Sequence, residues 1–475
     1  MSPAKVLKLL DDPRWSLRIV GLAILLRVFA ALVWQNQCAA SGVTLKFGDS
    51  QSYWTIAHNL VVNGEYQYGS GQSRIFRAPV YPLFLSLFAW CEHSLIGGLA
   101  QTPFVLAARL AGCVLGGGIV WLLMFWTRQI AGPRASCLSG ILAATYSGAV
   151  GMSIFVLSEA VATPLFVLSC WMLWSSTRRS SQIQDPTNTD RAGLYWSAGS
   201  GVAFGLACLA RPSWGLWPAV AFPMLLIASN RHSHNKLALW LKIVGIFLAS
   251  ATLVMAPWWI RNFAITGKFV PTTLQVGASL YDGWHAGASG SSDENMEFSM
   301  NMMHRIVQEE GLLASNASSG LPLESTLEWR IDRRLSQEAW KWARENPSDV
   351  AKLGLVKFVK TWSPMPRAQE LSNPMIRYWE AGGYLIILGA SAFGLYVLRK
   401  DRRRLTDAVW FALPCIYLAL LHMVFIGSVR YRQPGVLLLC GLAGIGLSAM
   451  IEIVFPILKP DWASRQKDAV GNTRE

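Results

Sequence analysis

Charged residues are scarce in this chain of 475 residues: Asp, Glu, Lys and Arg together make up 15% of it. A soluble protein of ordinary composition carries about 25%. Apolar residues make up 52% of the sequence, and its mean hydropathy is +0.33. Few charges together with long apolar runs are typical of a protein that lies partly in lipid. The composition therefore argues against a soluble enzyme and indicates an integral membrane protein.

Cysteine motifs that bind metals are also lacking. The eight cysteines form no CxxC pair and no Cys/His spacing suited to a metal ion. Most lie inside apolar runs, where they act as small hydrophobic residues. Cys38 and Cys91 bracket the first long segment between apolar runs. A disulfide between them stays open, because spacing alone does not establish the geometry of the bond.

Nucleic acid is not an expected partner, although the formal net charge is +14. The basic residues cluster in short tracts between apolar runs, where the signals for membrane orientation lie. No motif resembles one that reads a nucleic-acid groove. Orientation in the membrane therefore explains the charge.

Ten apolar runs approach the roughly 20 residues that a helix needs to cross a membrane. They lie near Ile19–Trp34, Phe104–Trp126, Ser136–Gly151, Ala160–Trp174, Leu194–Ala210, Trp214–Ala228, Leu239–Trp258, Ala381–Leu398, Asp407–Ile426 and Gly435–Phe455. The fifth and sixth are short and could form one broken pair. The sequence predicts an all-α polytopic membrane protein with about ten transmembrane helices.

Orientation follows from the basic tracts, which all fall on one side if both termini are cytoplasmic. The opposite, extracytoplasmic side then receives two long segments: the first segment, Gln35–Pro103, and the second segment, Ile260–Gly382. The expected protein lies in the inner (plasma) membrane. Its expected divisions are a cytoplasmic N-terminus (1–18), a transmembrane module (19–258) that includes loop 35–103, a large loop (259–382), C-terminal helices (383–455) and a cytoplasmic tail (456–475).

Asp49 lies in the first segment, shortly after the first apolar run. Gly48 precedes it, and the residues after it, including Tyr53, have helical spacing. One interpretation makes Asp49 the cap of that helix. The other makes it a general base or metal ligand at the membrane surface, since only Glu65 and Glu92 are further acids in this segment.

Arg77 and Tyr81 follow in a stretch with two prolines that precedes a short apolar, interfacial helix. The prolines suit a helix start, and Arg77 could bind an anionic partner such as a lipid phosphate. In the second segment, Thr326–Ala343 and Val350–Trp362 have the periodicity of amphipathic helices. The Gly/Ser-rich stretch Gly283–Ser292 fits a loop that orders over a substrate or an inert linker.

Several ionisable residues fall within or at the edges of the spans, where charge is costly unless it has a partner or a water-filled cavity. Arg27 is expected to pair inside the bundle. Glu159 begins the fourth span at about the depth of Asp49, and Arg211 lies in the turn after the fifth span. Arg430 and Arg432 precede the tenth span on the same side, against the topology rule.

Acids and bases from distant parts of the chain thus gather at one leaflet. This arrangement suits a substrate with an apolar tail in the bilayer and a phosphate at its surface. The arginines would hold the phosphate while a carboxylate deprotonates an acceptor.

Several motifs resemble those of the glycosyltransferase C superfamily, in the branch that holds protein O-mannosyltransferases and the lipid A aminoarabinose transferase. They are Asp49-x-x-x-Tyr53-x-x-x-Ala57, Arg77-x-Pro79-x-Tyr81-Pro82, Ser158-Glu159, Leu209-Ala-Arg211-Pro212, Ala256-Pro-Trp-Trp-Ile-Arg261-Asn262, Glu345-Asn-Pro347 and Arg430-Tyr-Arg432-x-Pro434. Their order and their fit to the topology carry the resemblance over most of residues 15–455.

The resemblance implies an inverting transferase that moves a sugar from a polyprenyl-phosphate donor to a cell-envelope acceptor, which could be a lipid, a polysaccharide or a protein. It implies that Asp49 and Glu159 are catalytic. It also implies that Arg77, Arg211, Arg430, Arg432, Tyr53 and Tyr81 bind the donor phosphate or shape its pocket. Membrane lipids are further expected partners.

One departure concerns a metal ion. Many relatives carry a second acid directly after the first-loop Asp, whereas Ser50 and Gln51 follow Asp49 here. A divalent metal is possible, but no obligatory cofactor is expected. A lipid or glycolipid transporter (flippase) is the alternative function, and a non-catalytic scaffold is a third. A transporter would more commonly show paired halves with charges near the midplane.

Overall fold

The computed structural model of the protein describes residues 14–69, 73–96, 101–179, 186–228, 236–292, 297–309, 323–366 and 373–454. The predicted cytoplasmic tail, 456–475, and the first 13 residues of the predicted N-terminus lie outside these ranges. Within them the elements are helices, and the one β pairing is an isolated bridge between Tyr68 and Ser73. The prediction of an all-α polytopic membrane protein is confirmed.

Seven of the described helices are long and apolar enough to cross a membrane, judged by length and composition. They are α2 (Arg14–Ala40), α5 (Gln101–Thr145), α7 (Glu159–Arg179), α8 (Pro186–Ala210), α10 (Lys236–Thr266), α15 (Pro374–Leu398) and α18 (Val429–Val454). The pair α16 (Arg402–Val409) and α17 (Leu413–Val424), bent by 44°, passes the same test as a broken span or a re-entrant loop and brings the number to eight if it is counted as one span. The short apolar helix α9 (Pro218–Ala228) follows the turn η1 (Pro212–Trp214). The count of ten stays a prediction.

Helix α5 contains the second predicted span and the first part of the third. Gly132 has φ 85° and ψ −177°, which no helix adopts, and Pro133 follows it. Beyond this point Ser136 Oγ donates a hydrogen bond to Met124 O at 2.7 Å. Twelve residues of straight helix would separate these atoms by about 18 Å. The chain therefore folds back at Gly132, and the later half continues through Tyr146 into α6 (Ser147–Ile154).

Three boundaries differ from the predictions. Helix α2 continues past Trp34 to Ala40, and α10 continues past Trp258 to Thr266 with Pro257 inside it. The link predicted over residues 427–434 is mostly helical, because α18 already begins at Val429 and contains Pro434. The last difference places the Arg430-Tyr-Arg432 motif on a helix, which fixes where each side chain points.

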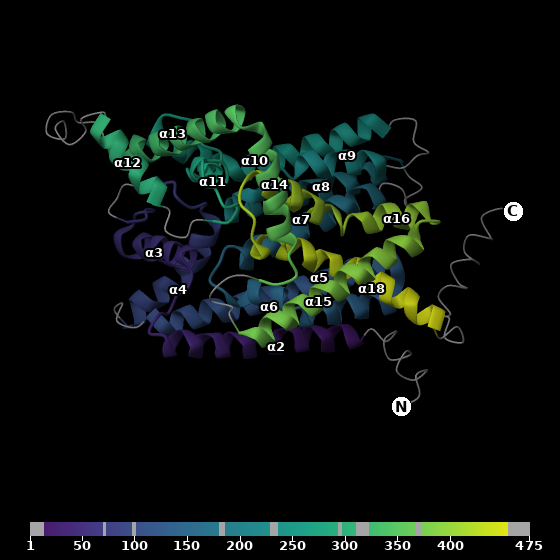
Figure 1. Cartoon of the computed structure of the whole chain (residues 1–475). Helices are drawn as coiled ribbons and strands as arrows, with labels where there is room; N and C mark the ends of the chain where they lie inside the picture. Colours follow the sequence, from purple (N-terminus) through teal and green to yellow (C-terminus); the bar gives the residue numbers. More distant parts are fainter. Residues whose placement is uncertain are drawn as a thin grey trace.

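The two long segments form their own helices at one end of the bundle. The first segment contains α3 (Gly48–Asn63) and α4 (Val80–Ile96), and the second contains α11 (Val276–Gly283), α12 (Glu297–Glu309), α13 (Leu323–Glu345) and α14 (Pro347–Trp362). Figure 1 shows α3, α4 and α11 to α13 together on the left, with α16 at the opposite end. The amphipathic helices predicted in the second segment are confirmed as α13 and α14.

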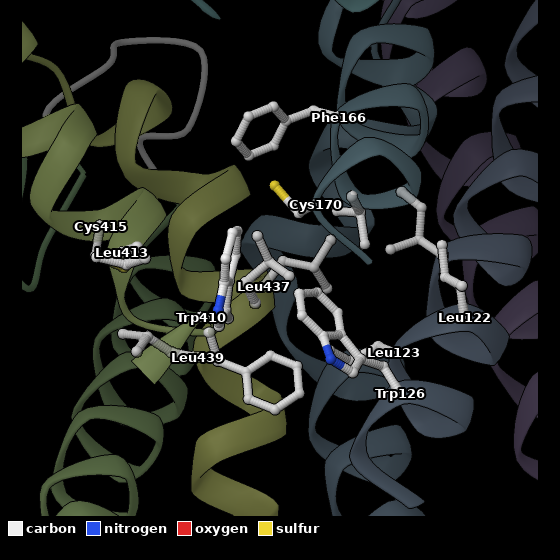
Figure 2. Packing of buried hydrophobic residues seen from close by; sticks show 14 of the residues in the cluster. Leu122, Leu123, Trp126, Phe166, Cys170, Trp410, Leu413, Cys415, Leu437 and Leu439 are labelled. Atoms are coloured by element: carbon white, nitrogen blue, oxygen red, sulfur yellow. The ribbon is translucent and has the colours of Figure 1, made fainter. Parts of the chain in front are cut away.

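The core of the bundle is aromatic and aliphatic. Figure 2 shows Trp410, Leu437 and Trp126 in one layer below Phe166 and Cys170. Each of these side chains is at most 2% exposed. They come from the α16–α17 junction, α18, α5 and α7, so the layer joins the spans that carry the candidate site.

Arg27 pairs inside the bundle, as predicted. It is 1% exposed and donates to the carbonyl oxygens of Ala23, Ala143 and Ala144 and to Ser153 Oγ. These acceptors satisfy a charge that would be costly in lipid. The possible disulfide is not formed, since Cys38 and Cys91 are both free thiols.

Helices α15 and α18 pack closely through glycines. A Cβ atom on Gly446 would overlap the carbonyl oxygen of Ala390, with Gly394 beside it. We expect Gly446→Val to lower the free energy of unfolding by about 1–3 kcal/mol, the usual cost of overpacking. Gly389→Val is the control, because Gly389 has open space around it on the exposed face of α15. Equal thermal unfolding of the two variants in detergent would contradict this packing.

Candidate functional site

A cavity of about 2370 Å³ opens between the bundle and the helices of the two long segments. Ligand pockets usually measure 300–1,000 Å³, so this one has room for a large ligand. One part is lined by apolar side chains of α2, including Leu26, Phe29 and Val33. Another part is lined by ionisable side chains from α3, α7, α13 and α18. The cavity thus joins an apolar surface to a charged one.

Asp49 lies in the first turn of α3 and lines the cavity. The interpretation of Asp49 as a helix cap is wrong: Phe47 occupies the N-cap position, and no side chain caps the helix. The carboxylate instead meets two arginines. Its Oδ1 lies 2.6 Å from Arg77 Nη2, and its Oδ2 lies 2.8 Å from Arg430 Nη1. The Asp49 side chain is still 34% exposed, so a ligand in the cavity can reach it.

The position of α3 follows from its sequence. Tyr53, Trp54 and Ala57 form a buried face that packs against α4. Gly64 ends the helix with φ 68°, a left-handed conformation that glycine adopts without strain. The packed face leaves Asp49 on the side that borders the cavity.

Arg77 precedes α4 and is held on several sides. Its Nε donates to Ser52 Oγ at 2.9 Å, and its Nη1 donates to Gln275 Oε1 at 2.9 Å. The guanidinium lies 4.8 Å from the centre of the Tyr53 ring, within cation–π range. Tyr66 Oη donates to the Arg77 carbonyl oxygen at 2.9 Å. The Arg77 guanidinium therefore presents to Asp49 in a fixed orientation.

Arg430 joins the two predicted acids. Its Nε lies 2.5 Å from Glu159 Oε1 and its Nη2 lies 3.1 Å from Glu159 Oε2, while Nη1 binds Asp49. Glu159 begins α7 and is only 2% exposed. Arg211, from the turn after α8, adds a contact to Glu159 Oε1 at 3.0 Å. Five spatially connected charges thus come from four distant parts of the chain.

Two predicted residues lie outside this cluster. Arg432 is fully buried and faces the other way, with Nη1 donating to Thr361 O at 3.4 Å and Nη2 lying 3.6 Å from Glu380 Oε1. Residues two apart on a helix point about 200° apart, so Arg430 and Arg432 cannot share a site on α18. Tyr81 packs edge-on against Tyr53 at 4.9 Å between ring centres, behind the cavity wall.

Other residues of the cavity wall were not predicted from the sequence. Gln275 binds Arg77, and the Tyr431 ring lies 5.3 Å from the Arg211 guanidinium and is stacked on His422. Lys46 also lines the cavity, 5.2 Å from the Trp34 ring centre. Lys46 lies three residues before Asp49 in the sequence, and this proximity is the signal that could have identified it.

Burial by itself would raise the pKa of Asp49. The positive charges of Arg77 and Arg430, together with their hydrogen bonds, outweigh burial and hold the pKa well below its usual range. Asp49 therefore stays ionised in acid. Because its folded-state pKa is depressed, its contribution to stability is present above the unfolded-state pKa and is lost as the pH falls toward the folded-state value.

A divalent metal does not fit this arrangement. Within the described ranges, no three His, Cys, Asp or Glu side chains converge in a way that could hold a metal ion. The guanidinium of Arg430 lies between Asp49 and Glu159, where an ion bridging the two carboxylates would have to bind. Whether the protein needs a metal stays a prediction from the sequence.

Comparisons with known proteins bear on the fold. No protein-family profile and no curated protein sequence matches the chain. The archaeal oligosaccharyltransferase AglB from Archaeoglobus fulgidus, solved with an inhibitory peptide and a dolichol-phosphate, is similar with a TM-score of 0.56 at 11% identity over 96% of this chain. Its apo form gives 0.56 at 13% identity over 97%. This chain spans about half the length of that protein, 52%.

A second similar structure is ArnT from Cupriavidus metallidurans bound to undecaprenyl phosphate, with 16% identity and a TM-score of 0.41. The match covers 94% of this chain and 80% of that one. The likeness to the oligosaccharyltransferase is one of fold, and it agrees with the all-α membrane fold that the sequence motifs imply.

Proposed function

We propose that the protein is a membrane glycosyltransferase that moves a sugar from a polyprenyl-phosphate-linked donor to a hydroxyl or amine of a cell-envelope acceptor, on the extracytoplasmic face. One observation carries the proposal. The carboxylate of Asp49 is reachable within a cavity that joins apolar helix faces to a cluster of three arginines. An apolar tail, a phosphate and a base for the acceptor each find matching side chains there.

Asp49 acts as the base in this proposal. The acceptor oxygen or nitrogen attacks the anomeric carbon of the sugar, while the bond from that carbon to the phosphate oxygen breaks. The proton of the acceptor goes to Asp49, and polyprenyl phosphate leaves as the anion. A single displacement from the face opposite the phosphate inverts the anomeric centre. A phosphate leaving group needs little help from an acid, so one carboxylate and several cations suffice.

The arginines serve two functions in turn. Without donor, Arg77 and Arg430 neutralise Asp49 and make it a weak base. A bound phosphate competes for the same guanidinium groups, because a guanidinium can donate two parallel hydrogen bonds to one phosphate. The contacts to Asp49 weaken as the phosphate binds, and its basicity rises when the donor is in place. Glu159 stays deep in the bundle and keeps Arg430 and Arg211 at the site.

Lys46 is the cation best placed to receive the phosphate first. It lines the same cavity, and no carboxylate among the described residues pairs with it. We expect Lys46→Met to raise the donor KM about tenfold, or ~1.4 kcal/mol, with kcat changed less than about threefold. Steady-state turnover against donor concentration checks this. Lys352→Met is the control, since Lys352 is exposed and pairs with Asp349 on α14; an equal effect of both variants would remove Lys46 from the donor site.

The proposal is tested by adding purified protein in nanodiscs to a polyprenyl-phosphate sugar and envelope acceptor fractions. Mass spectrometry should show free polyprenyl phosphate and an acceptor heavier by one sugar residue. Comparing envelope glycans with and without the chain then identifies the acceptor. Movement of the lipid across sealed vesicles with no sugar transferred would overturn the proposal in favour of a transporter.

A further inference from the structure

Helix α13 carries two carboxylates one turn apart, Glu328 and Asp332, that the mechanism above does not use. Both line the cavity. Glu328 Oε2 accepts hydrogen bonds from the backbone N–H groups of Arg74 and Ile75, each at 3.0 Å. Asp332 Oδ1 accepts one from the N–H of Gly277 at 2.7 Å. One helix face thus binds the backbones of both long segments.

Both attachment points adjoin Arg77: one is in the chain just before it, and the other is next to the residue that binds its side chain. Arg74 and Ile75 immediately precede it in the chain. Gly277 lies in the first turn of α11, two residues after Gln275, which accepts from the Arg77 side chain. The N–H of Leu274 also donates to Ile75 O at 3.1 Å, which joins the two segments directly.

The fit at α11 is close enough to fix its position. A Cβ atom on Gly277 would overlap the carbonyl oxygen of Asp332, so glycine is needed for α11 to approach α13. Beyond the carboxylates, Leu327, Ile331 and Leu335 are buried or half-buried against α11 and α12. These apolar side chains hold α13 against α11 and α12, and the two carboxylates determine which backbone N–H groups α13 binds.

We propose that Glu328 and Asp332 are positioning residues, which hold Arg77 in register with Asp49 by fixing the chain before Arg77 and the start of α11 to helix α13. This inference rests on the proposed function only for its effect on turnover. The second segment then does more than cover the cavity: its docking sets the geometry of the charged cluster. A misplacement of about 1 Å at such a cluster can cost roughly 10²-fold in rate.

Protonation of the two carboxylates offers a distinct signature. Burial raises the pKa of Glu328 to about 7 and that of Asp332 to about 6. Arg261 of α10, Arg74 and Tyr66 of the first segment, and Asp332 surround Glu328. Asp332 faces backbone N–H groups of α11. Lys268 Nζ lies 5.5 Å from the ring centre of Trp329, the residue that follows Glu328. Because these pKa values are raised, docking of α13 is most stable at low pH and weakens as the pH rises toward and through about 7.

The test uses the full chain in nanodiscs with Glu328→Ala and Glu328→Gln. We expect Glu328→Ala to lower kcat/KM for the donor about 10- to 100-fold, because a displaced Arg77 serves both the donor phosphate and Asp49 less well. Hydrogen exchange at residues 74 and 75 should rise at least tenfold. Glu328→Gln keeps an acceptor for both N–H groups, so its turnover should stay within about threefold of the wild type. The protection of the amides of residues 74 and 75, relative to their intrinsic exchange rates, should also depend less on pH between 5 and 8 in Glu328→Gln than in the wild type.

Two further measurements separate positioning from general destabilisation. Glu338→Ala on the same helix is the matched control, since the half-buried Glu338 pairs with Arg334 at 3.4 Å and with Arg305 at 3.9 Å, and, among the residues that the structure describes, no hydrogen bond joins it to residues 74 and 75. If Glu328 acts through Arg77, the double variant Glu328→Ala/Arg77→Ala should turn over no more slowly than Arg77→Ala alone. Additive losses, or exchange at 74 and 75 equal to that of Glu338→Ala, would overturn the inference. If Glu328→Ala raises the exchange at residues 74 and 75 but the wild-type protein transfers no sugar, the positioning of this segment by α13 stands and the proposed function is refuted.

Discussion

Replacing Asp49 with Asn should lower kcat for sugar transfer by about 10²–10⁴-fold, the range that a general base contributes. The amide keeps the shape of the side chain but cannot take the acceptor proton. Arg77 and Arg430 lose an ionic partner that is one-third exposed, so the fold should persist. Turnover in nanodiscs gives the loss in rate, and thermal unfolding in detergent shows whether the protein remains folded.

Donor binding distinguishes loss of the base from loss of the site. With Asp49 neutral, the two arginines remain available to a phosphate, so the affinity for the polyprenyl-phosphate donor should be unchanged or higher. Asp349→Asn serves as the control, because Asp349 is an exposed acid on α14 that pairs with Lys352. Near-normal turnover of Asp49→Asn would show that another group removes the proton, and Asp49 would then be a ligand of the arginines alone.

The sequence could predict the neighbourhood of this site because membrane topology limits where residues can lie. Asp49 and Arg430 are separated by 381 positions, yet both follow from counting spans and placing basic tracts on one side. Counting the spans does not require the exact residue at which each helix begins or ends. The hairpin at Gly132 separates the second and third predicted runs. Helix α9, with 11 residues, is too short to count among the membrane-crossing helices, so the predicted sixth span stays untested.

Side-chain direction could not be predicted in the same way. The sequence predicts that the Arg430-Tyr-Arg432 motif lies in a link, where both arginines are free to face the site. Because α18 starts at Val429, the two side chains diverge, and only Arg430 reaches Asp49. The pattern of α13 likewise predicted an apolar stripe through Leu327 and Leu335, but an amphipathic pattern does not say which backbone a carboxylate will meet.

Arg430→Gln should have the second large effect, on stability as well as on rate. The change leaves Glu159 and Asp49 without their shared cation, and Glu159 is 2% exposed. Removing one partner of a buried pair costs about 3–5 kcal/mol. Arg211 remains 3.0 Å from Glu159, so we expect a loss near about 3 kcal/mol in the free energy of unfolding. Arg334→Gln, at an exposed position of α13, should change the free energy of unfolding by less than about 0.5 kcal/mol.

The double variant Arg430→Gln/Glu159→Gln separates the structural role of the ion pair from its chemical role. Glu159→Gln leaves no buried carboxylate at that position, but it also removes the partner of Arg211, so only part of the lost stability should return. Turnover should not return, because the phosphate of the donor still lacks the guanidinium that links it to Asp49. Recovery of both stability and turnover would mean that Arg430 serves only to neutralise Glu159. Recovery of neither would mean that stability depends on the two ionic contacts that the double variant also lacks, Arg430 with Asp49 and Arg211 with Glu159.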